Sequence, residues 1–167
     1  MKTEPLEVIV GQLLAAQGLT LALAESCTGG LVGHRLTEVS GSSAYFLGGI
    51  VSYSYPAKER LLGVPHDTLY GQGAVSVEVA LAMARGARRV LDADVGLSVT
   101  GIAGPTGGTP DKPVGLVYVA LATPEGERWE QYVWAEDRSG NKAASAEAAL
   151  DLLRCYLEEG ERAGCPQ

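Results

Sequence analysis

Cysteine and histidine are scarce in this chain of 167 residues, which contains three cysteines and two histidines. Cys27, Cys155 and Cys165 are odd in number and irregularly spaced, so they do not form a disulfide framework. The absence of a Cys-x-x-Cys pair or a histidine-rich segment predicts that no metal is bound. No run of about 18 apolar residues occurs, and the N-terminal segment does not resemble a secretory signal. We therefore expect a cytoplasmic protein with reduced cysteines and no membrane span.

Basic residues are also few, because the chain has 13 lysines and arginines and 20 acidic residues, which gives a net charge of −7. Nucleic-acid binding depends on a basic patch that neutralises phosphates, so we expect no nucleic-acid partner. A small phosphorylated ligand held by one or two cations remains compatible with this charge. Aromatic residues make up only 6% of the chain, which predicts a core built from leucine, valine and alanine.

Helical and strand patterns alternate along the first hundred residues. This order predicts one domain with a layered α/β sandwich and a mixed sheet, although it does not fix the strand order. A turn at residues 124–126 indicates that the last two strands form a hairpin. Residues 66–73 are expected to be a loop or a helical turn. Helices are predicted at 4–17, 31–39, 56–62, 77–90 and 139–158, and strands at 20–24, 47–53, 95–100, 116–122 and 128–134.

Ser26 lies where a buried strand meets a helix, in the segment AESCTGG. The N-terminus of a helix offers free backbone N–H groups that can hold an anion or an oxyanion beside the hydroxyl. The N–H groups near Thr28 and Gly29 are the expected donors to such an oxyanion, and Gly29 and Gly30 would let a ligand approach the backbone. The alternative is that Ser26 or Thr28 merely caps the helix, which is the commonest reason for such a residue there. Cys27 is a rival nucleophile, but we favour a packing role because no histidine is placed to activate it.

Lys58 lies just past the second predicted strand, in the first turn of a short helix. A lysine can act as a base when burial lowers its pKa towards neutrality, although most lysines are solvated and have no such role. His34 and His66 have no nearby Ser/Asp signature, so a Ser-His-Asp triad has little support. Tyr53 and Tyr55 could line such a site or relay a proton, or could simply pack at the strand end.

Two further segments could hold an anion. The stretch 100–115 is rich in glycine and proline, and such loops either expose N–H groups to a ligand or are simply flexible surface loops. Arg138 and Lys142 flank the start of the last helix, where an anion would also feel the helix dipole, but solvated charges are usual there. The candidate ligand-binding residues of the loop are Thr100, Gly101, Gly104, Gly107 and Gly108.

Taken in order, these segments resemble the CinA C-terminal domain family. The resemblance covers about residues 5–157 and runs through the following motifs: AESCTGGLVGHRL, GSSAYFLGGIVSYS followed by Lys58, LLGV, GAVS, SVTGIAGPTGGTPDKPVGLVYVAL, and the pair Asp137–Arg138 before the final helix. That family includes stand-alone nicotinamide-nucleotide amidases, also called nicotinamide mononucleotide deamidases. Several motifs of this length in one order are unlikely to coincide by chance.

The resemblance implies a three-layer α/β/α sandwich that hydrolyses the carboxamide of nicotinamide mononucleotide without a metal or an organic cofactor. The family's nucleophile falls on Ser26, its lysine partner on Lys58, and two further site residues on Tyr53 and Thr100. Many members carry a second arginine where this chain has Lys142. The planar guanidinium of an arginine can make a bidentate contact with an anion, whereas the lysine amine acts as a point charge.

Other interpretations remain open at this stage. The chain could be a regulatory domain of the competence/damage-inducible type that binds a nucleotide or a protein without catalysis. It could also be a different amidase or esterase that uses the same Ser-Lys dyad. A homodimer is compatible with a small domain of this kind.

Overall fold

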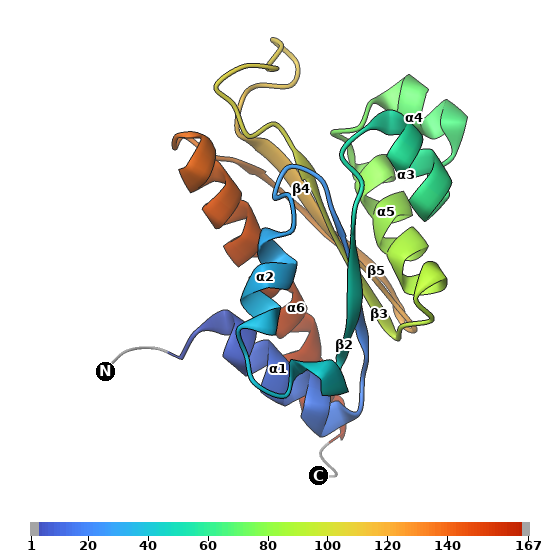
Figure 1. The fold of residues 1–167 in the computed structure, drawn as a ribbon, viewed down its shortest axis with the longest axis vertical. Helices are drawn as coiled ribbons and strands as arrows, with labels where there is room; N and C mark the ends of the chain where they lie inside the picture. Colours follow the sequence, from blue (N-terminus) through green and yellow to red (C-terminus); the bar gives the residue numbers. More distant parts are fainter. Residues whose placement is uncertain (1–3, 165–167) are drawn as a thin grey trace.

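A five-stranded mixed sheet forms the centre of the molecule, whose computed structural model describes residues 4–164, with side chains described through residue 160 (Figure 1). The strand order is β2-β1-β3-β4-β5. The first three of these run parallel, while β4 is antiparallel to both β3 and β5. The strands are β1 (Leu21–Glu25), β2 (Phe46–Val51), β3 (Val95–Gly101), β4 (Leu116–Thr123) and β5 (Gly126–Val133).

Helices cover both faces of the sheet, which gives the three-layer α/β/α sandwich that the sequence predicted (Figure 1). One face carries α1 (Leu6–Gln17), α2 (Leu31–Thr37) and α6 (Arg138–Gly164), and the other carries α3 (Tyr55–Leu62), α4 (His66–Gln72) and α5 (Val77–Val90). A short 3₁₀ turn, η1 (Ser42–Ala44), precedes β2. Within residues 4–164, no helix is both long enough and apolar enough to cross a lipid bilayer.

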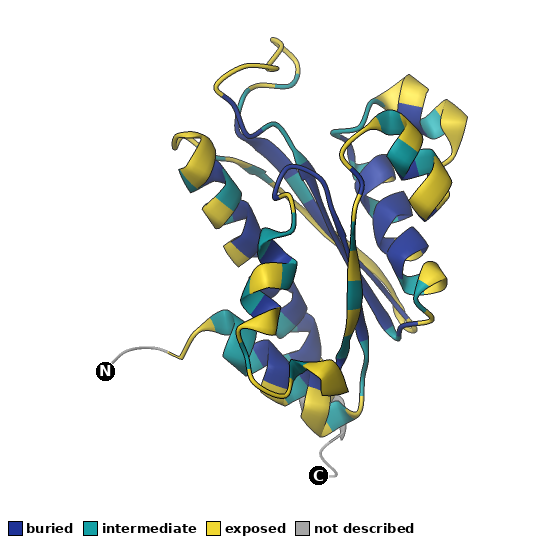
Figure 2. Ribbon diagram, in the orientation of Figure 1, coloured by how far each residue is buried: buried dark blue, intermediate teal, exposed yellow. Residues whose placement is uncertain are grey.

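Aliphatic side chains fill the two spaces between the layers, as the scarcity of aromatic residues predicted. The strands β1 and β3 are buried along nearly their whole length, whereas β5 forms an exposed edge (Figure 2). The larger cluster joins the sheet to α1, α2 and α6, and includes Leu14, Leu23, Leu97 and Leu153. A second cluster joins the sheet to α3, α4 and α5 around Leu62 and Met83. Burying these side chains supplies the main stabilisation of the fold.

The parallel strands determine where a site can form. Because β1, β2 and β3 run in the same direction, their carboxyl ends lie at one edge of the sheet. The turn after β1, the segment after β2 and the glycine-rich loop after β3 all begin at this edge. In open α/β sheets, ligands bind outside the carboxyl ends of the strands. Three of the four candidate segments therefore converge, although their sequence separation is large.

Several element boundaries differ from the sequence-based expectation, including the end of α6, which extends to Gly164 rather than to residue 158. The strand β2 ends at Val51, so Ser52 and Tyr53 lie beyond it in the connection to α3. Residues 66–72 form the helix α4, where the sequence indicated a loop or a helical turn, and Leu69 anchors this helix to the core. Its single buried side chain explains why no apolar periodicity marked it.

Candidate active site

Ser26 and Lys58 meet at the carboxyl edge of the sheet. Ser26 is the first residue after β1, and its N–H donates to the carbonyl oxygen of Val99 on β3. Lys58 projects from the first turn of α3, which Ser54 caps by accepting from the N–H of Ala57. The Nζ of Lys58 lies 3.0 Å from the Oγ of Ser26 and 2.5 Å from the carbonyl oxygen of Ser52. A hydroxyl and an amine thus lie within hydrogen-bond reach, which is the arrangement that a nucleophile and its base require.

The amine of Lys58 is withdrawn from water, because the residue is only 1% exposed. Burial disfavours the charged form and lowers the pKa of Lys58 to about 8 from its ordinary value of 10.5. A much larger fraction of this lysine is therefore neutral near physiological pH than of a solvated lysine, as a general base requires.

Cys27, the rival nucleophile, is not suited to that role. It is 5% exposed and belongs to the core cluster beneath α2. Burial raises the pKa of its thiol to about 12. Because the thiolate is the reactive form of cysteine, this residue acts as a packing group, in agreement with the interpretation favoured from the sequence.

Glu25 is a structural residue of the site that the sequence analysis missed. It ends β1, is 2% exposed, and accepts from the hydroxyl of Thr28 at 2.6 Å. Its two carboxylate oxygens also accept from the N–H groups of Val32 and Gly33 in the first turn of α2, each at 3.0 Å. The carboxylate thereby caps the helix and fixes the turn that carries Ser26. An acidic residue shortly before a helix start was the only signal for this role.

The contacts of Glu25 correct the expectation that the N-terminus of α2 offers free donors. The N–H groups of Val32 and Gly33 are occupied by the carboxylate, and the N–H of Gly29 donates to the carbonyl oxygen of Ser26. Among the described residues, the N–H groups of Thr28 and Gly30 have no acceptor within the protein. Any oxyanion formed at Ser26 would therefore depend on the turn itself rather than on the helix.

Replacing Glu25 by alanine should lower the free energy of unfolding by about 3 kcal/mol, because three buried donors lose their acceptor. Urea unfolding followed by circular dichroism measures this change. Glu127→Ala is the matched control, since it removes a carboxylate from an exposed ion pair with Arg85 and should cost less than about 1 kcal/mol. Equal stabilities of the two variants would show that the cap does not hold the turn.

Tyr53 and Arg138 form a bridge at the rim of this edge. Tyr53 is 62% exposed, and its hydroxyl accepts from Arg138 at 3.1 Å. The same guanidinium donates to the carbonyl oxygen of Gly104 at 2.7 Å. Arg138, the first residue of α6, therefore links the segment after β2 to the glycine-rich loop. Tyr55 lies apart from this bridge, and its hydroxyl accepts from the N–H of Ala74.

Lys142 lies one turn after Arg138 on α6 and therefore on the same side of the helix. A Cβ atom placed on Gly29 would come 3.8 Å from its Nζ, so this lysine reaches the turn that carries Ser26. Asn141, which the sequence analysis also missed, is buried and donates to the carbonyl oxygen of Ala103. The start of α6 thus lies beside the turn that carries Ser26 and contacts the glycine-rich loop.

The glycine-rich loop has a structural explanation that requires no ligand. A Cβ atom at Gly104 or Gly108 would collide with Val114, and one at Gly101 would collide with Val117. At Gly107, which has a φ of +93°, a side chain would strain the backbone. Thr100 is 1% exposed and its hydroxyl donates to the carbonyl oxygen of Ala74. These residues let the connection between β3 and β4 fold back closely on itself.

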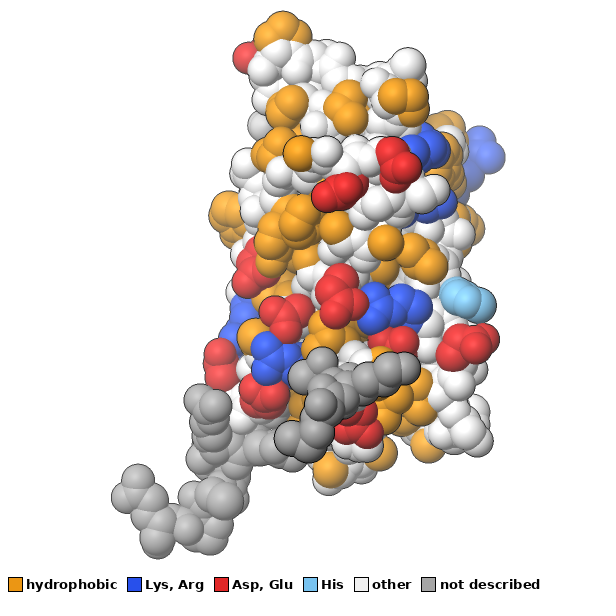
Figure 3. Space-filling model, turned by 90° about the vertical axis from the view of Figure 1, so that its left-hand side faces the viewer, with side chains coloured by type: hydrophobic (Ala, Val, Ile, Leu, Met, Phe, Trp, Pro, Cys, Tyr) orange, Lys and Arg blue, Asp and Glu red, His pale blue; other side chains and the backbone are white. Residues whose placement is uncertain are grey.

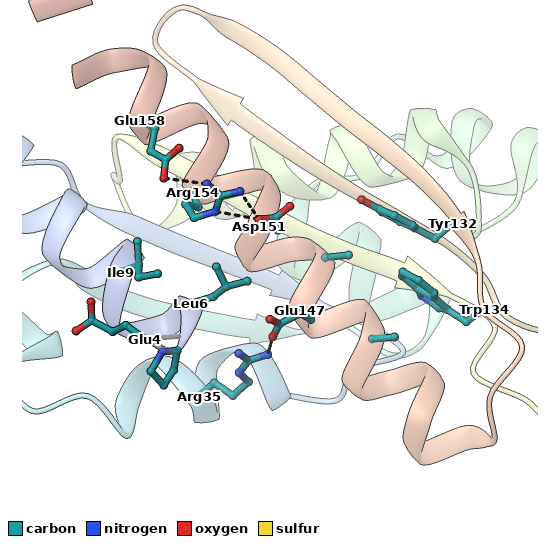
Figure 4. Close-up of a pocket in the computed structure, with 13 residues that line it drawn as sticks. Glu4, Leu6, Ile9, Arg35, Tyr132, Trp134, Glu147, Asp151, Arg154 and Glu158 are labelled. Atoms are coloured by element: carbon teal, nitrogen blue, oxygen red, sulfur yellow. Dashed lines mark hydrogen bonds and ion pairs between the residues drawn. The ribbon is translucent and has the colours of Figure 1, made fainter. Parts of the chain in front are cut away.

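Two hollows in the described part of the molecule differ in their relation to these segments. A depression of about 460 Å³ lies between the glycine-rich loop and the start of α6, and Arg138 lines it. A larger groove of about 920 Å³ lies on another face, between α1, α6 and β5 (Figures 3 and 4). Its two arginines, Arg35 and Arg154, are held in ion pairs with acidic neighbours (Figure 4). None of the candidate site residues lines this groove.

Groups of three or more histidine, cysteine, aspartate or glutamate side chains able to hold a metal ion are absent from the described part of the chain. The polar groups at the carboxyl edge include the Ser26 hydroxyl, the buried Lys58 amine, the cations of Arg138 and Lys142 and backbone amides, while the Glu25 carboxylate is committed to Thr28 and the first turn of α2. Such a set is suited to nucleophilic attack beside an anionic ligand.

Nearly the whole chain is similar to known proteins in sequence and structure. Residues 3–157 match the family model of the CinA C-terminal domain. A CinA-like protein from Geobacter sulfurreducens is 56% identical over 152 residues, which cover 91% of this chain but only 37% of that relative's length.

Two solved structures have the same fold. A competence/damage-inducible protein from Agrobacterium tumefaciens is 39% identical, with a TM-score of 0.86, and the match covers 95% of this chain and 99% of that one. A CinA superfamily protein from Klebsiella pneumoniae is 30% identical, with a TM-score of 0.89 and coverages of 92% and 96%. The similarity therefore extends well beyond the motifs around Ser26 and Lys58.

Proposed function

Because this chain belongs to the CinA C-terminal domain family, we propose that it is an amidohydrolase that converts nicotinamide mononucleotide to nicotinic acid mononucleotide and ammonia. The observation that carries the proposal is the contact between the buried Lys58 amine and the Ser26 hydroxyl. Burying a lysine amine away from any carboxylate is costly, and such groups are concentrated at functional sites. A domain that only bound a nucleotide or a protein would have no use for this arrangement.

In the first step, the neutral amine of Lys58 removes the proton of Ser26 as Oγ attacks the carboxamide carbon. The carbonyl oxygen becomes an oxyanion, for which the unoccupied N–H groups of Thr28 and Gly30 are the available donors. Each well-placed donor of this kind typically contributes about 3 kcal/mol to the stabilisation of the transition state.

In the second step, the protonated Lys58 gives its proton to the leaving nitrogen, and ammonia departs as the carbon–nitrogen bond breaks. An ester between Ser26 and the nicotinoyl group remains. Water then attacks this ester with Lys58 again as the base, which releases the acid and regenerates the serine. The sum is the amide plus water giving the carboxylic acid plus ammonia.

The remaining cations suit a phosphorylated substrate. Lys142 lies beside the Ser26 turn, while Arg138 lines the depression between the loop and α6. We propose that these two residues hold the ribose phosphate, which places the pyridine carboxamide at Ser26. Arg138 would have to exchange or share its present contact with Tyr53 when the substrate binds.

The decisive experiment offers the protein three substrates that differ in one feature each: the mononucleotide, the dinucleotide and free nicotinamide. We expect ammonia release from the mononucleotide, with weaker or no release from the other two. Calorimetric titration on the same samples separates the alternatives. Nucleotide binding without any product would replace this proposal by a regulatory binding domain, and release from unrelated amides or esters would point to another substrate.

The value of kcat/KM should rise with pH and level off above an inflection near pH 8. The active form of Lys58 is neutral, and its pKa of about 8 means that raising the pH through this range deprotonates it. At pH 7, only about one tenth of the enzyme would be in the active form. Chromatography of the acid product in stopped samples gives the profile without relying on ammonia detection. A flat profile, or one that falls over this range, would contradict a neutral lysine base.

A further inference from the structure

Ser52 presents an unusual feature, because its hydroxyl is buried and has no hydrogen-bond partner. The residue is 0% exposed. Within the described residues, its Oγ is one of only two buried side-chain polar atoms that lack a partner, the other being the hydroxyl of Tyr45. Leaving a buried hydroxyl unsatisfied is costly, so such an atom calls for an explanation.

The backbone of Ser52 is fixed on both sides of this hydroxyl. Its N–H donates to the carbonyl oxygen of Glu25 at 2.9 Å, and its own carbonyl oxygen accepts from the Nζ of Lys58 at 2.5 Å. The unsatisfied Oγ is only a few covalent bonds from the oxygen that contacts the lysine. Rotation about the Cα–Cβ bond, which has three staggered positions, is the remaining freedom of this residue.

The amine of Lys58, in turn, has one N–H donor too many for its acceptors when it is protonated. A protonated amine has three N–H donors, and a neutral amine has two donors and one lone pair. The described residues provide two partners for Nζ, the Oγ of Ser26 and the carbonyl oxygen of Ser52. After Lys58 takes the proton of Ser26, its third N–H therefore has no acceptor. An unpaired donor on a buried cation costs more than one on a neutral amine.

Neither of the two acidic groups nearest in sequence to Ser26, the Cys27 thiol and the Glu25 carboxylate, is available to stabilise the protonated form of Lys58. Burial raises the pKa of Cys27 to about 12, so its thiol is neutral while Lys58 titrates. The carboxylate of Glu25 is committed to Thr28 and to the first turn of α2. Besides Cys27 and Glu25, the helix α3 itself carries Tyr55, Glu59 and Arg60, and Tyr53 precedes it. On the neighbouring elements, α5 carries Glu78, Arg85, Arg88 and Arg89, and the start of α6 carries Arg138 and Lys142.

We propose that the hydroxyl of Ser52 turns to accept the third N–H of Lys58 and so stabilises the lysine in its protonated form. Ser52 is then a positioning residue, which acts on the substrate only through Lys58. It would hold the proton taken from Ser26 until the leaving nitrogen receives it. This catalytic consequence rests on the proposed function, whereas the contact itself can be tested without any substrate.

The test is a pH titration of Lys58 by NMR in protein labelled at the lysine Cε atoms. The chain has only four lysines, at positions 2, 58, 112 and 142, so their signals can be resolved. Loss of one signal in the variant Lys58→Met identifies that of Lys58. We expect Ser52→Ala to lower the pKa of Lys58 by about one unit, because a hydrogen bond to the charged form is lost.

Two further variants make the result specific. Ser54→Ala removes the N-cap of the same helix, so it should destabilise α3 without moving the titration of Lys58. Ser52→Cys keeps a similar shape but is a weaker acceptor, so it should lower the pKa by a smaller amount and serves if the alanine variant does not fold.

An unchanged or raised pKa of Lys58 in the folded Ser52 variants would overturn the proposal. That outcome does not depend on turnover, so it is distinct from failure of the proposed function, which absence of ammonia release would reveal. If both hold, the inflection of the pH–rate profile should move to lower pH in Ser52→Ala by the same amount as the NMR titration.

Discussion

Replacing Ser26 by alanine should abolish ammonia release from nicotinamide mononucleotide. The hydroxyl is the only group on the chain that the mechanism allows to form the acyl-enzyme, and loss of a catalytic nucleophile typically lowers kcat by a factor of about 10⁴ to 10⁶. The change removes one oxygen from a residue that is 8% exposed, so the fold should persist. Binding should persist as well, because the phosphate contacts proposed for Arg138 and Lys142 are untouched.

Steady-state kinetics measures the loss of ammonia release, and calorimetry on the same sample measures whether the substrate still binds. Cys27→Ala is the matched control, because it removes a reactive atom from the adjacent residue, whose thiol is protonated and packed in the core. We expect the control to retain turnover within a few-fold. Full activity of Ser26→Ala would refute the serine mechanism, and loss of activity in Cys27→Ala alone would transfer the role of nucleophile to the thiol.

The general architecture could be predicted from the sequence because it depends on local periodicity. The run of apolar residues at 21–24 is buried on both faces of the sheet, as its lack of polar alternation indicated. The hairpin of β4 and β5 was marked by its turn. The strand order was not predictable, because it depends on which strands meet across long separations, such as β1 between β2 and β3. For α4 the sequence indicated only a loop or a helical turn, because one buried leucine gives no periodic signal.

For the candidate site, the sequence pointed to the reactive side chains but not to the groups that hold them. Ser26 and Lys58 stood out through strand ends and family motifs, and the structure brings them to 3.0 Å. Glu25 and Asn141 gave little signal, because their partners are backbone groups brought close by the fold. The glycines of the loop were interpreted as ligand-binding, whereas close packing against Val114 also demands Gly104 and Gly108. Their role towards a ligand stays a prediction.

Replacing Lys58 by methionine should eliminate catalysis and, at the same time, make the protein more stable near pH 7. Loss of a general base typically lowers the rate by a factor of about 10² to 10⁴, and the effect should not add to that of Ser26→Ala because the two groups act as a unit. Methionine is unbranched and of similar length, so it can fill the same space without a charge.

The gain in stability follows from the pKa of the lysine. Its value falls from 10.5 to about 8 on folding, so below pH 8 the folded state holds the charge at a cost of about 3 kcal/mol. The cost disappears as the pH rises from 8 to 10.5, because the unfolded chain then loses its proton as well. Methionine leaves two acceptors without a donor, at about 1 kcal/mol each, so a net gain of about 1 kcal/mol is expected at pH 7.

Urea unfolding at pH 7 and at pH 10 checks both the size and the sign of this effect. The stability advantage of Lys58→Met over the wild type should shrink, and can reverse, as the pH rises through this window. Lys112→Met is the matched control, since this lysine donates from the glycine-rich loop to the carbonyl oxygen of Gln72, and its loss should not stabilise the protein. The opposite trend, in which the advantage of Lys58→Met over the wild type is smaller at pH 7 than at pH 10, would contradict this account. The folded state would then carry the charge of Lys58 at no cost, and its amine would not have the lowered pKa that the proposed chemistry requires.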